Sequence, residues 1–132
     1  MLSKSRKNIG KKKILIVDDE HYFLKACKRY LMDSFTVKAL NSGKAAIILL
    51  QIESDFDVIF LDVGIPDLPG IKVFEYIKNH HPELIGKVVF VTAGVFDQET
   101  QNLLNETQNV KLEKPFDLDD LVEQISRVTS LG

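Results

Sequence analysis

The hydrophobic residues of this chain fall into short unbroken runs that alternate with longer amphipathic stretches. The runs at 13–17, 58–61 and 87–91 are rich in β-branched and aromatic residues, and each is too short for a helix. Such runs are typical of strands buried on both faces of a parallel sheet. Residues 36–40 alternate as a strand nearer the sheet edge would, and 110–113 make a short last strand.

Stretches with helical spacing of apolar residues fill the intervals between these strands. We expect Asn41-Ser42-Gly43 and Asp117 to cap two of these helices. The helix within 96–108 has few apolar residues, so we expect it to be thinly anchored. The expected apolar positions are Phe23, Cys27, Tyr30 and Leu31; Ala45, Ile48, Leu49 and Ile52; Val73, Phe74 and Ile77; Phe96, Leu103 and Leu104; and Leu118, Leu121, Val122, Ile125 and Val128.

Five strands therefore alternate with five helices over about 118 residues. Short connections and right-handed crossovers predict an α/β fold, a doubly wound five-stranded parallel sheet with helices on both faces. We expect the flavodoxin-like strand order 2-1-3-4-5, which places strands 1 and 3 side by side at the switch point. The fold should occupy residues 13–132 as one domain.

Charge divides the chain into two unlike parts. The net charge is -2, but residues 1–13 carry +6 and the remainder carries -8. We expect residues 1–12 to be a solvated, disordered leader, and we expect no nucleic-acid binding through the acidic domain.

No apolar run reaches the length of a membrane span, so we expect no membrane contact. Cys27 is the single cysteine, which excludes an internal disulfide and favours a cytoplasmic setting.

Polar residues follow the buried strands at the point where each strand ends. Asp18 and Asp19 follow the first strand, and Asp62 ends the third. Thr92 ends the fourth strand, and Lys114 follows the fifth. Because ligands of open α/β sheets bind at the carboxyl ends of the strands, we expect these five side chains to converge there.

Three carboxylates in one cleft repel one another unless a cation joins them. An all-oxygen ligand set suits a hard cation, and Mg²⁺ is the obvious candidate. A carboxylate is also a nucleophile toward phosphorus, and its product is an aspartyl phosphate. Lys114 and Thr92 would supply the positive charge and the hydrogen bond that phosphoryl transfer requires.

The motifs Asp18-Asp19, Asp62-Val63-Gly64-Ile65-Pro66 with Gly70, Thr92-Ala93 and Lys114-Pro115-Phe116 resemble those of response-regulator receiver domains of two-component signalling. This resemblance covers nearly all of residues 13–130 and implies the CheY-like fold. It implies a signalling domain and not an enzyme, because such domains catalyse only their own phosphorylation and dephosphorylation.

The resemblance also implies a role for each residue of these motifs. Asp62 would accept the phosphoryl group from the phosphohistidine of a sensor histidine kinase or a histidine phosphotransfer protein. Mg²⁺ would bind Asp19, Asp62 and the Gly64 carbonyl, with Asp18 acting through water. Thr92 and Lys114 would bind the phosphoryl oxygens, and Ala93 is small enough not to block them. The bond between Lys114 and Pro115 would be cis.

Two departures from the family pattern stand out. Lys111 occupies the position where the family usually has Tyr or Phe, whose ring swings inward on activation. Thr107-Gln108 replaces the usual Gly-Ala pair, and the segment 110–116 is closest to receivers of hybrid sensor kinases. The chain ends at Gly132, so we expect no output domain within it, and the downstream target would be a protein.

Other functions remain open at this point. The chain could be a phosphorelay module or a pseudo-receiver from a hybrid histidine kinase, although a pseudo-receiver would be expected to lose Asp62 or Lys114. A phosphatase of the haloacid-dehalogenase type also uses an aspartyl phosphate. It requires an Asp-x-Asp pair after the first strand and a cap insertion, and neither is present.

Overall fold

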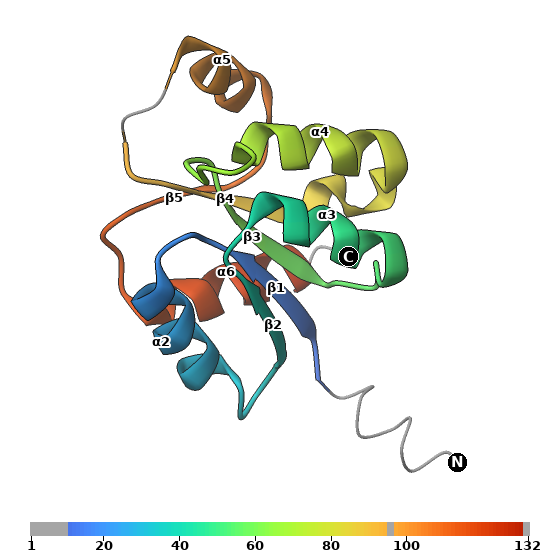
Figure 1. Ribbon diagram of the computed structural model, residues 1–132. Helices are drawn as coiled ribbons and strands as arrows, with labels where there is room; N and C mark the ends of the chain where they lie inside the picture. The colour runs from blue at the N-terminus through green and yellow to red at the C-terminus, as the bar shows by residue number, and fades with distance from the viewer. Residues whose placement is uncertain (1–10, 95–96, 131–132) are drawn as a thin grey trace.

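A five-stranded parallel sheet forms the middle of the computed structural model, which describes residues 11–94 and 97–130 (Figure 1). The strand order is β2-β1-β3-β4-β5, which confirms the predicted order. The strands are β1 (Lys13–Val17), β2 (Thr36–Leu40), β3 (Val58–Asp62), β4 (Val88–Thr92) and β5 (Lys111–Glu113).

Helices cover both faces of this sheet, as predicted. Figure 1 shows α3, α4 and α5 on one side and α2 and α6 on the other. Lys87, predicted to open the fourth strand, instead ends the short 3₁₀ helix η1 (Pro82–Lys87). The α-helices are α2 (His21–Leu31), α3 (Gly43–Ile52), α4 (Gly70–His80), α5 (Gln98–Glu106) and α6 (Leu118–Ser130).

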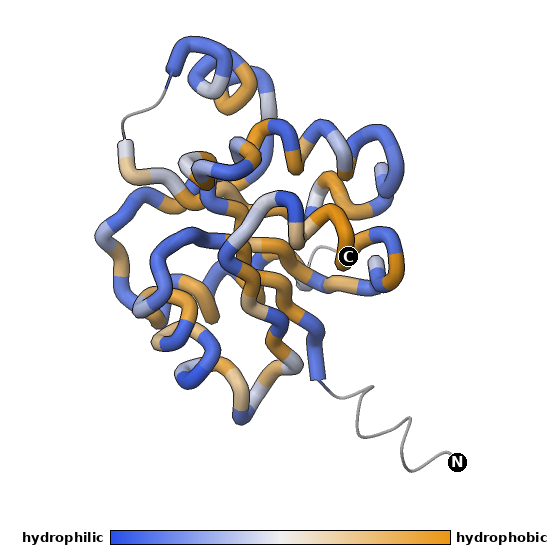
Figure 2. Tube along the Cα trace, in the orientation of Figure 1, coloured by the Kyte–Doolittle hydropathy of each residue, from blue (hydrophilic) through white to orange (hydrophobic). Residues whose placement is uncertain are grey.

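The core lies in two layers, one on each side of the sheet. Every residue of β3 and β4 is buried, because these strands lie between neighbours and beneath helices on both faces. Figure 2 shows hydrophobic residues concentrated along the sheet. Cys27 on α2 belongs to this core and is fully buried. Burial raises the pKa of its thiol to about 12.

The predicted apolar faces of three helices need correction. Tyr30 of α2, Ile48 and Ile52 of α3, and Val122 of α6 are exposed rather than buried. The inward positions omitted from the predicted faces are Leu24, Ala46, Leu50 and Gln124. In α3 the error has a physical cause, since a helix with apolar residues around most of its circumference does not reveal its buried side. Phe96 lies outside the described residues, as do residues 1–10 of the predicted leader.

Side-chain caps begin two of the helices. Ser42 Oγ accepts a hydrogen bond from the Ala45 amide at the start of α3, as expected for its position. The Asp97 carboxylate accepts one from the Thr100 amide at the start of α5. α6 begins at Leu118, directly after Asp117.

The loop between α5 and β5 is fastened to the start of β4. Asn109 Nδ2 donates to the carbonyl oxygens of Ile85 at 2.7 Å and Val88 at 2.8 Å. Lys111 Nζ donates to the carbonyl oxygens of Thr107 and Asn109, so the Lys111 side chain lies along the surface of this loop. No helix in the described ranges is both long and apolar enough to cross a membrane.

Gly70 marks a close approach between a helix and the sheet. A Cβ atom added there would collide with the Asp62 carbonyl oxygen and lie 2.7 Å from Val63 Cα. Both neighbours are backbone atoms, which cannot rotate away. The first turn of α4 therefore requires glycine for contact with the end of β3.

We expect Gly70→Ala to lower the free energy of unfolding by about 2–3 kcal/mol, because overpacking against backbone forces a shift of α4. Gly86→Ala is the matched control, since an added Cβ at Gly86 meets nothing within 4 Å. That variant should differ from the parent by no more than about 1 kcal/mol. Urea unfolding of both variants measures the difference, and equal stabilities would contradict the packing argument.

Candidate phosphoryl-acceptor site

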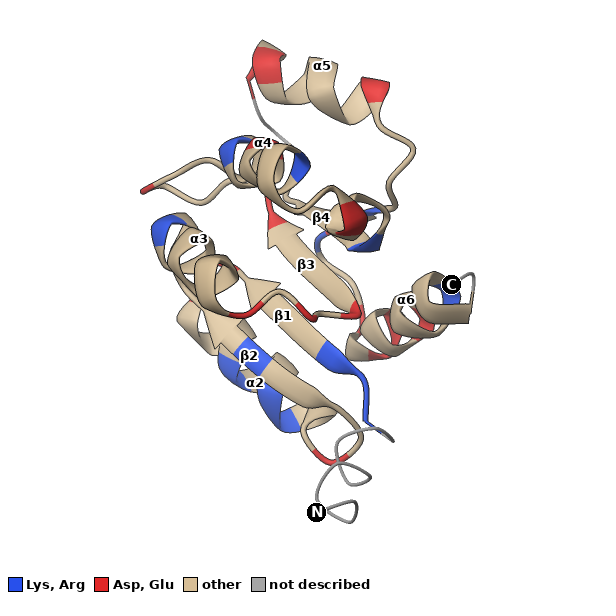
Figure 3. Cartoon of the chain, turned by 90° about the vertical axis from the view of Figure 1, so that its right-hand side faces the viewer, with Lys and Arg blue, Asp and Glu red and all other residues tan. Residues whose placement is uncertain are grey.

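Three carboxylates meet where β1 and β3 end. The pairing of Val17 with Leu61 aligns the two strands, so the residues that follow them lie side by side. Asp18 and Asp62 are buried, whereas Asp19 is exposed. Each residue offers a carboxylate oxygen within 4.8 Å of the other two. The three acids expected at this edge are thus brought together, and Figure 3 shows acidic colouring at the arrowhead of β3.

Backbone amides hold the two buried carboxylates. Asp62 Oδ1 accepts a hydrogen bond of 3.0 Å from the amide of Gly64, and Asp18 Oδ1 accepts one of 2.8 Å from the amide of Glu20. Each bond closes a tight turn that continues away from the strand. Asp18 therefore lies in the turn before α2, which begins at His21.

Burial makes ionisation of this cluster unfavourable. Desolvation raises the pKa of Asp62 to about 6, the Gly64 amide opposes that rise, and the charge of Asp18 adds to it. Burial likewise raises the pKa of Asp18, against a hydrogen bond from Lys114. A positive charge placed among these oxygens would therefore lower the pKa of both groups.

Lys114 supplies one such charge. Its backbone amide donates to the Thr92 carbonyl oxygen at 2.7 Å, which ties the residue after β5 to the last residue of β4. Its Nζ lies 2.9 Å from Asp18 Oδ2, also pairs with Glu20, and lies 4.7 Å from the centre of the Phe23 ring. Burial lowers the pKa of this ammonium, but the hydrogen bonds to Asp18 and Glu20 outweigh it and the net pKa is raised.

Glu20 and Phe23 were not predicted as neighbours of Lys114. Glu20 directly follows the acidic pair Asp18-Asp19, and this position in the sequence was the available indication that it lies near the site. No pattern in the sequence links Phe23 to Lys114. Among the described residues, Lys114 forms its ion pairs with Asp18 and Glu20 and none with Asp62.

The other predicted residues, apart from Lys111, lie along the same edge. Thr92 is buried at the end of β4, and Ala93 follows it in an exposed position. Gly94 has φ +91°, a conformation that favours glycine. The peptide bond between Lys114 and Pro115 is cis. Lys111 is exposed and lies away from the carboxylates, at the start of β5.

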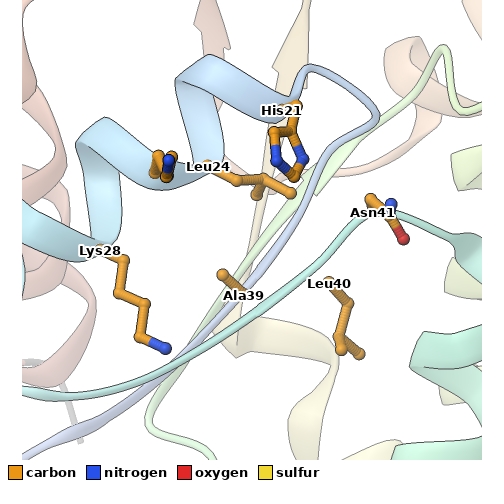
Figure 4. Close-up of a pocket in the computed structure, with 7 residues that line it drawn as sticks. His21, Leu24, Lys28, Ala39, Leu40 and Asn41 are labelled. Atoms are coloured by element: carbon orange, nitrogen blue, oxygen red, sulfur yellow. The ribbon is translucent and has the colours of Figure 1, made fainter.

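Two hollows of the structure lie away from the carboxylate cluster. One, of about 310 Å³, lies between α2 and the end of β2 and is lined by His21, Lys28 and Asn41 among others (Figure 4). The other, of about 750 Å³, lies between η1, the 107–110 loop and the end of α6. Asp18, Asp19 and Asp62 line neither of these hollows.

Solved receiver domains share this architecture. The non-phosphorylated HemR receiver domain from Leptospira biflexa has a TM-score of 0.76 and 27% identity, covering 92% of this chain and 97% of that one. The BeF3-activated DrrB receiver domain has a TM-score of 0.73 and 27% identity, with coverage of 91% and 98%.

Curated relatives extend well beyond the aligned region. The transcriptional regulatory protein CrdR of Helicobacter pylori is 33% identical over 118 residues, 88% of this chain and 54% of CrdR. Probable histidine kinase 3 of Oryza sativa subsp. japonica is 29% identical, over 90% of this chain and 14% of the kinase. The chain thus spans about half the length of the first relative and a smaller part of the second.

One family model matches most of the chain. The model of the response regulator receiver domain matches residues 14–126, which include β1 through most of α6. The matched region contains all the carboxylates of the cluster together with Thr92 and Lys114. This chain therefore belongs to the response regulator receiver domain family of two-component signalling.

Proposed function

We propose that this domain accepts a phosphoryl group on Asp62, in a Mg²⁺-dependent reaction, and signals the change to a protein partner. The donor is the phosphohistidine of a sensor histidine kinase or of a histidine phosphotransfer protein. The observation that carries the proposal is the cluster of Asp18, Asp19 and Asp62, with ligand oxygens within 4.8 Å of one another beside the Lys114 ammonium. Membership of the receiver family supports the same assignment and leaves the phosphatase alternative without support.

The donor set fits Mg²⁺. It consists only of oxygens, two of its carboxylates are buried, and burial raises the pKa of Asp62, a cost that a bound cation would offset. Asp19, Asp62 and the Gly64 carbonyl would hold the ion, and Asp18 would reach it through water. Bound Mg²⁺ neutralises the charge on the phosphoryl oxygens and keeps Asp62 ionised.

The residues of the chain carry out the transfer itself. A carboxylate oxygen of Asp62 attacks phosphorus, an O–P bond forms, and the P–N bond to the donor imidazole breaks. The electron pair of that bond leaves with the imidazole nitrogen, which takes up a proton. Lys114 and Thr92 bind the phosphoryl oxygens, and Ala93 is small enough to leave that space open.

Phosphorelay is a second candidate for the same site. The similarity to a histidine kinase of Oryza sativa favours it, as does the resemblance of 110–116 to receivers of hybrid kinases. In that role Asp62 would pass its phosphoryl group to a further histidine. A cytoplasmic setting suits either function, since the chain has one cysteine and no possible internal disulfide.

We expect Asp62→Asn to abolish phosphorylation by acetyl phosphate with Mg²⁺, since the amide is not a nucleophile. Asp19→Asn should weaken Mg²⁺ binding by at least about tenfold, because even residues that only support metal ligands contribute that much. Intact mass spectrometry measures the first effect, and calorimetry measures the second.

Asp33→Asn is the control for these two variants. It removes the same charge from an exposed carboxylate in the turn before β2, at the opposite edge of the sheet. That variant should be phosphorylated like the parent. An acid-labile phosphoryl group retained by Asp62→Asn would exclude Asp62 as the acceptor.

The raised pKa of Asp62 predicts a stability effect with a definite sign. Without metal, the folded protein must ionise Asp62 against a pKa of about 6, whereas the ordinary pKa of an aspartate is 3.8. Above pH 7 the ionised group therefore destabilises the fold, and Asp62→Asn should be more stable by about 1–3 kcal/mol. As pH falls from 6 to 4, Asp62 takes up its proton and the difference should disappear.

Urea unfolding at pH 7.5 and pH 4.5 measures this difference. Adding Mg²⁺ at pH 7.5 should stabilise the parent and leave Asp62→Asn nearly unchanged, because a ligand stabilises only the protein that binds it. Asp33→Asn again serves as the control and should follow the parent. An Asp62→Asn variant that is less stable than the parent at both pH values would contradict the burial argument.

We further propose that the signal leaves through α5, β5 and α6. α5 follows Thr92 in the chain and buries only Thr100 and Leu104 among its described residues, whereas α4 buries five. Figure 1 shows α5 at the edge of the molecule. A helix with so few buried side chains shifts at low cost when Thr92 moves toward a phosphoryl group.

Hydrogen exchange with and without beryllofluoride and Mg²⁺ tests this route. We expect changes in protection to concentrate in residues 92–116. Lys111→Ala should leave the phosphorylation rate nearly unchanged and alter partner affinity, because Lys111 contacts the 107–109 carbonyls and not the carboxylates. Changes limited to residues 62–70, with α5 unaffected, would refute it.

A further inference from the structure

The loop after Asp62 is fastened to a helix that contributes nothing to the carboxylate cluster. The Asp67 carboxylate accepts three hydrogen bonds from the start of α3. The donors are Ser42 Oγ at 2.6 Å, the Gly43 amide at 3.0 Å and the Lys44 amide at 3.2 Å. We refer to this set of contacts as the Asp67 clamp. Figure 3 shows the loop between β3 and α4 reaching toward the first turn of α3.

Close packing accompanies these hydrogen bonds. A Cβ atom added at Gly43 would lie 2.5 Å from the Leu68 carbonyl oxygen and 3.0 Å from Leu68 Cβ. The first turn of α3 therefore rests directly on the loop backbone beside Asp67. The Ser42 hydroxyl, followed by the Gly43 amide, lowers the pKa of Asp67 to about 2, so the clamp stays ionised across the range in which proteins fold.

The clamp is the main polar attachment of the middle of the loop. Gly64 is held at one end by its bond to Asp62, and Gly70 at the other donates to the Val63 carbonyl at 3.3 Å. In the described parts of the chain, the hydrogen bonds that join residues 65–68 to another element are those of Asp67. Ile65 is buried in the core and anchors the loop on its apolar side, and without the Asp67 contacts residues 66–68 would gain conformational freedom.

We propose that Asp67 is a positioning residue that holds the Gly64 carbonyl where the metal site needs it. The inference rests on the proposed function, in which that carbonyl is a ligand of Mg²⁺. Mg²⁺ requires near-ideal octahedral geometry, so a carbonyl on a loose loop binds it poorly. Asp62 itself is fixed by β3, and the clamp therefore affects metal affinity more than the transfer step.

The test compares Asp67→Ala with a matched variant, Asp97→Ala. Asp97 is also an exposed aspartate that accepts a bond from a helix-initial amide, that of Thr100 at 2.8 Å, but it caps α5 and not the loop after Asp62. Mg²⁺ affinity is measured by calorimetry for both variants and the parent. We expect Asp67→Ala to weaken binding by about tenfold, as removal of a supporting partner of a metal ligand does. Asp97→Ala should bind Mg²⁺ like the parent.

Two further measurements separate positioning from structural or charge effects. Phosphorylation by acetyl phosphate should need more Mg²⁺ in Asp67→Ala, yet reach the parental rate at saturating Mg²⁺. Asp67→Asn keeps an oxygen that can accept from the Gly43 amide, so its Mg²⁺ affinity should lie between those of Asp67→Ala and the parent. Thermal unfolding of each variant verifies that it is folded.

The outcomes separate this inference from the function on which it rests. A parent protein that binds no Mg²⁺ would overturn both. A parent that binds Mg²⁺, with Asp67→Ala binding equally well, would overturn only the positioning role. Equal loss in Asp67→Ala and Asp67→Asn would attribute the effect to the missing charge and would also overturn the positioning role.

Discussion

The ion pair between Lys114 and Asp18 is the interaction on which the carboxyl edge of this sheet depends. Asp18 and Asp62 are both buried at the ends of adjacent strands, and desolvation opposes the charge on each. Lys114 Nζ offsets part of that cost at 2.9 Å from Asp18. One ammonium does not neutralise the three carboxylates at this edge. The remaining negative charge is the condition that a cation-binding site requires.

The loop after β3 and helix α5 are anchored very differently. The loop after β3 is held by Gly64 at its start, by Asp67 in its middle and by the tight contact at Gly70. The segment after β4 leads to α5, which buries little. This contrast suits the proposed function, in which the loop after β3 keeps the metal ligands in place and α5 shifts on phosphorylation.

The strands and the candidate site were predictable because both depend on short-range patterns. The run at 58–61 is apolar throughout and ends on Asp62, so strand, burial and strand-end carboxylate follow from one stretch. The buried side of α3 was not predictable, because seven of the ten residues in Gly43–Ile52 are apolar and several faces are equally plausible. The contacts of Glu20 with Lys114 and of Asp67 with Ser42 join residues 94 and 25 positions apart, and no local pattern reveals them.

The burial of the Cys27 thiol affects how the protein reacts with alkylating reagents. With a pKa of about 12 and no exposed surface, it is almost entirely protonated at neutral pH and shielded from electrophiles. Its sulfur becomes accessible only when α2 separates from the sheet. Cys27 is thus an internal reporter whose rate of alkylation follows the opening of the α2–α6 layer, while a cysteine introduced on the surface would react independently of it.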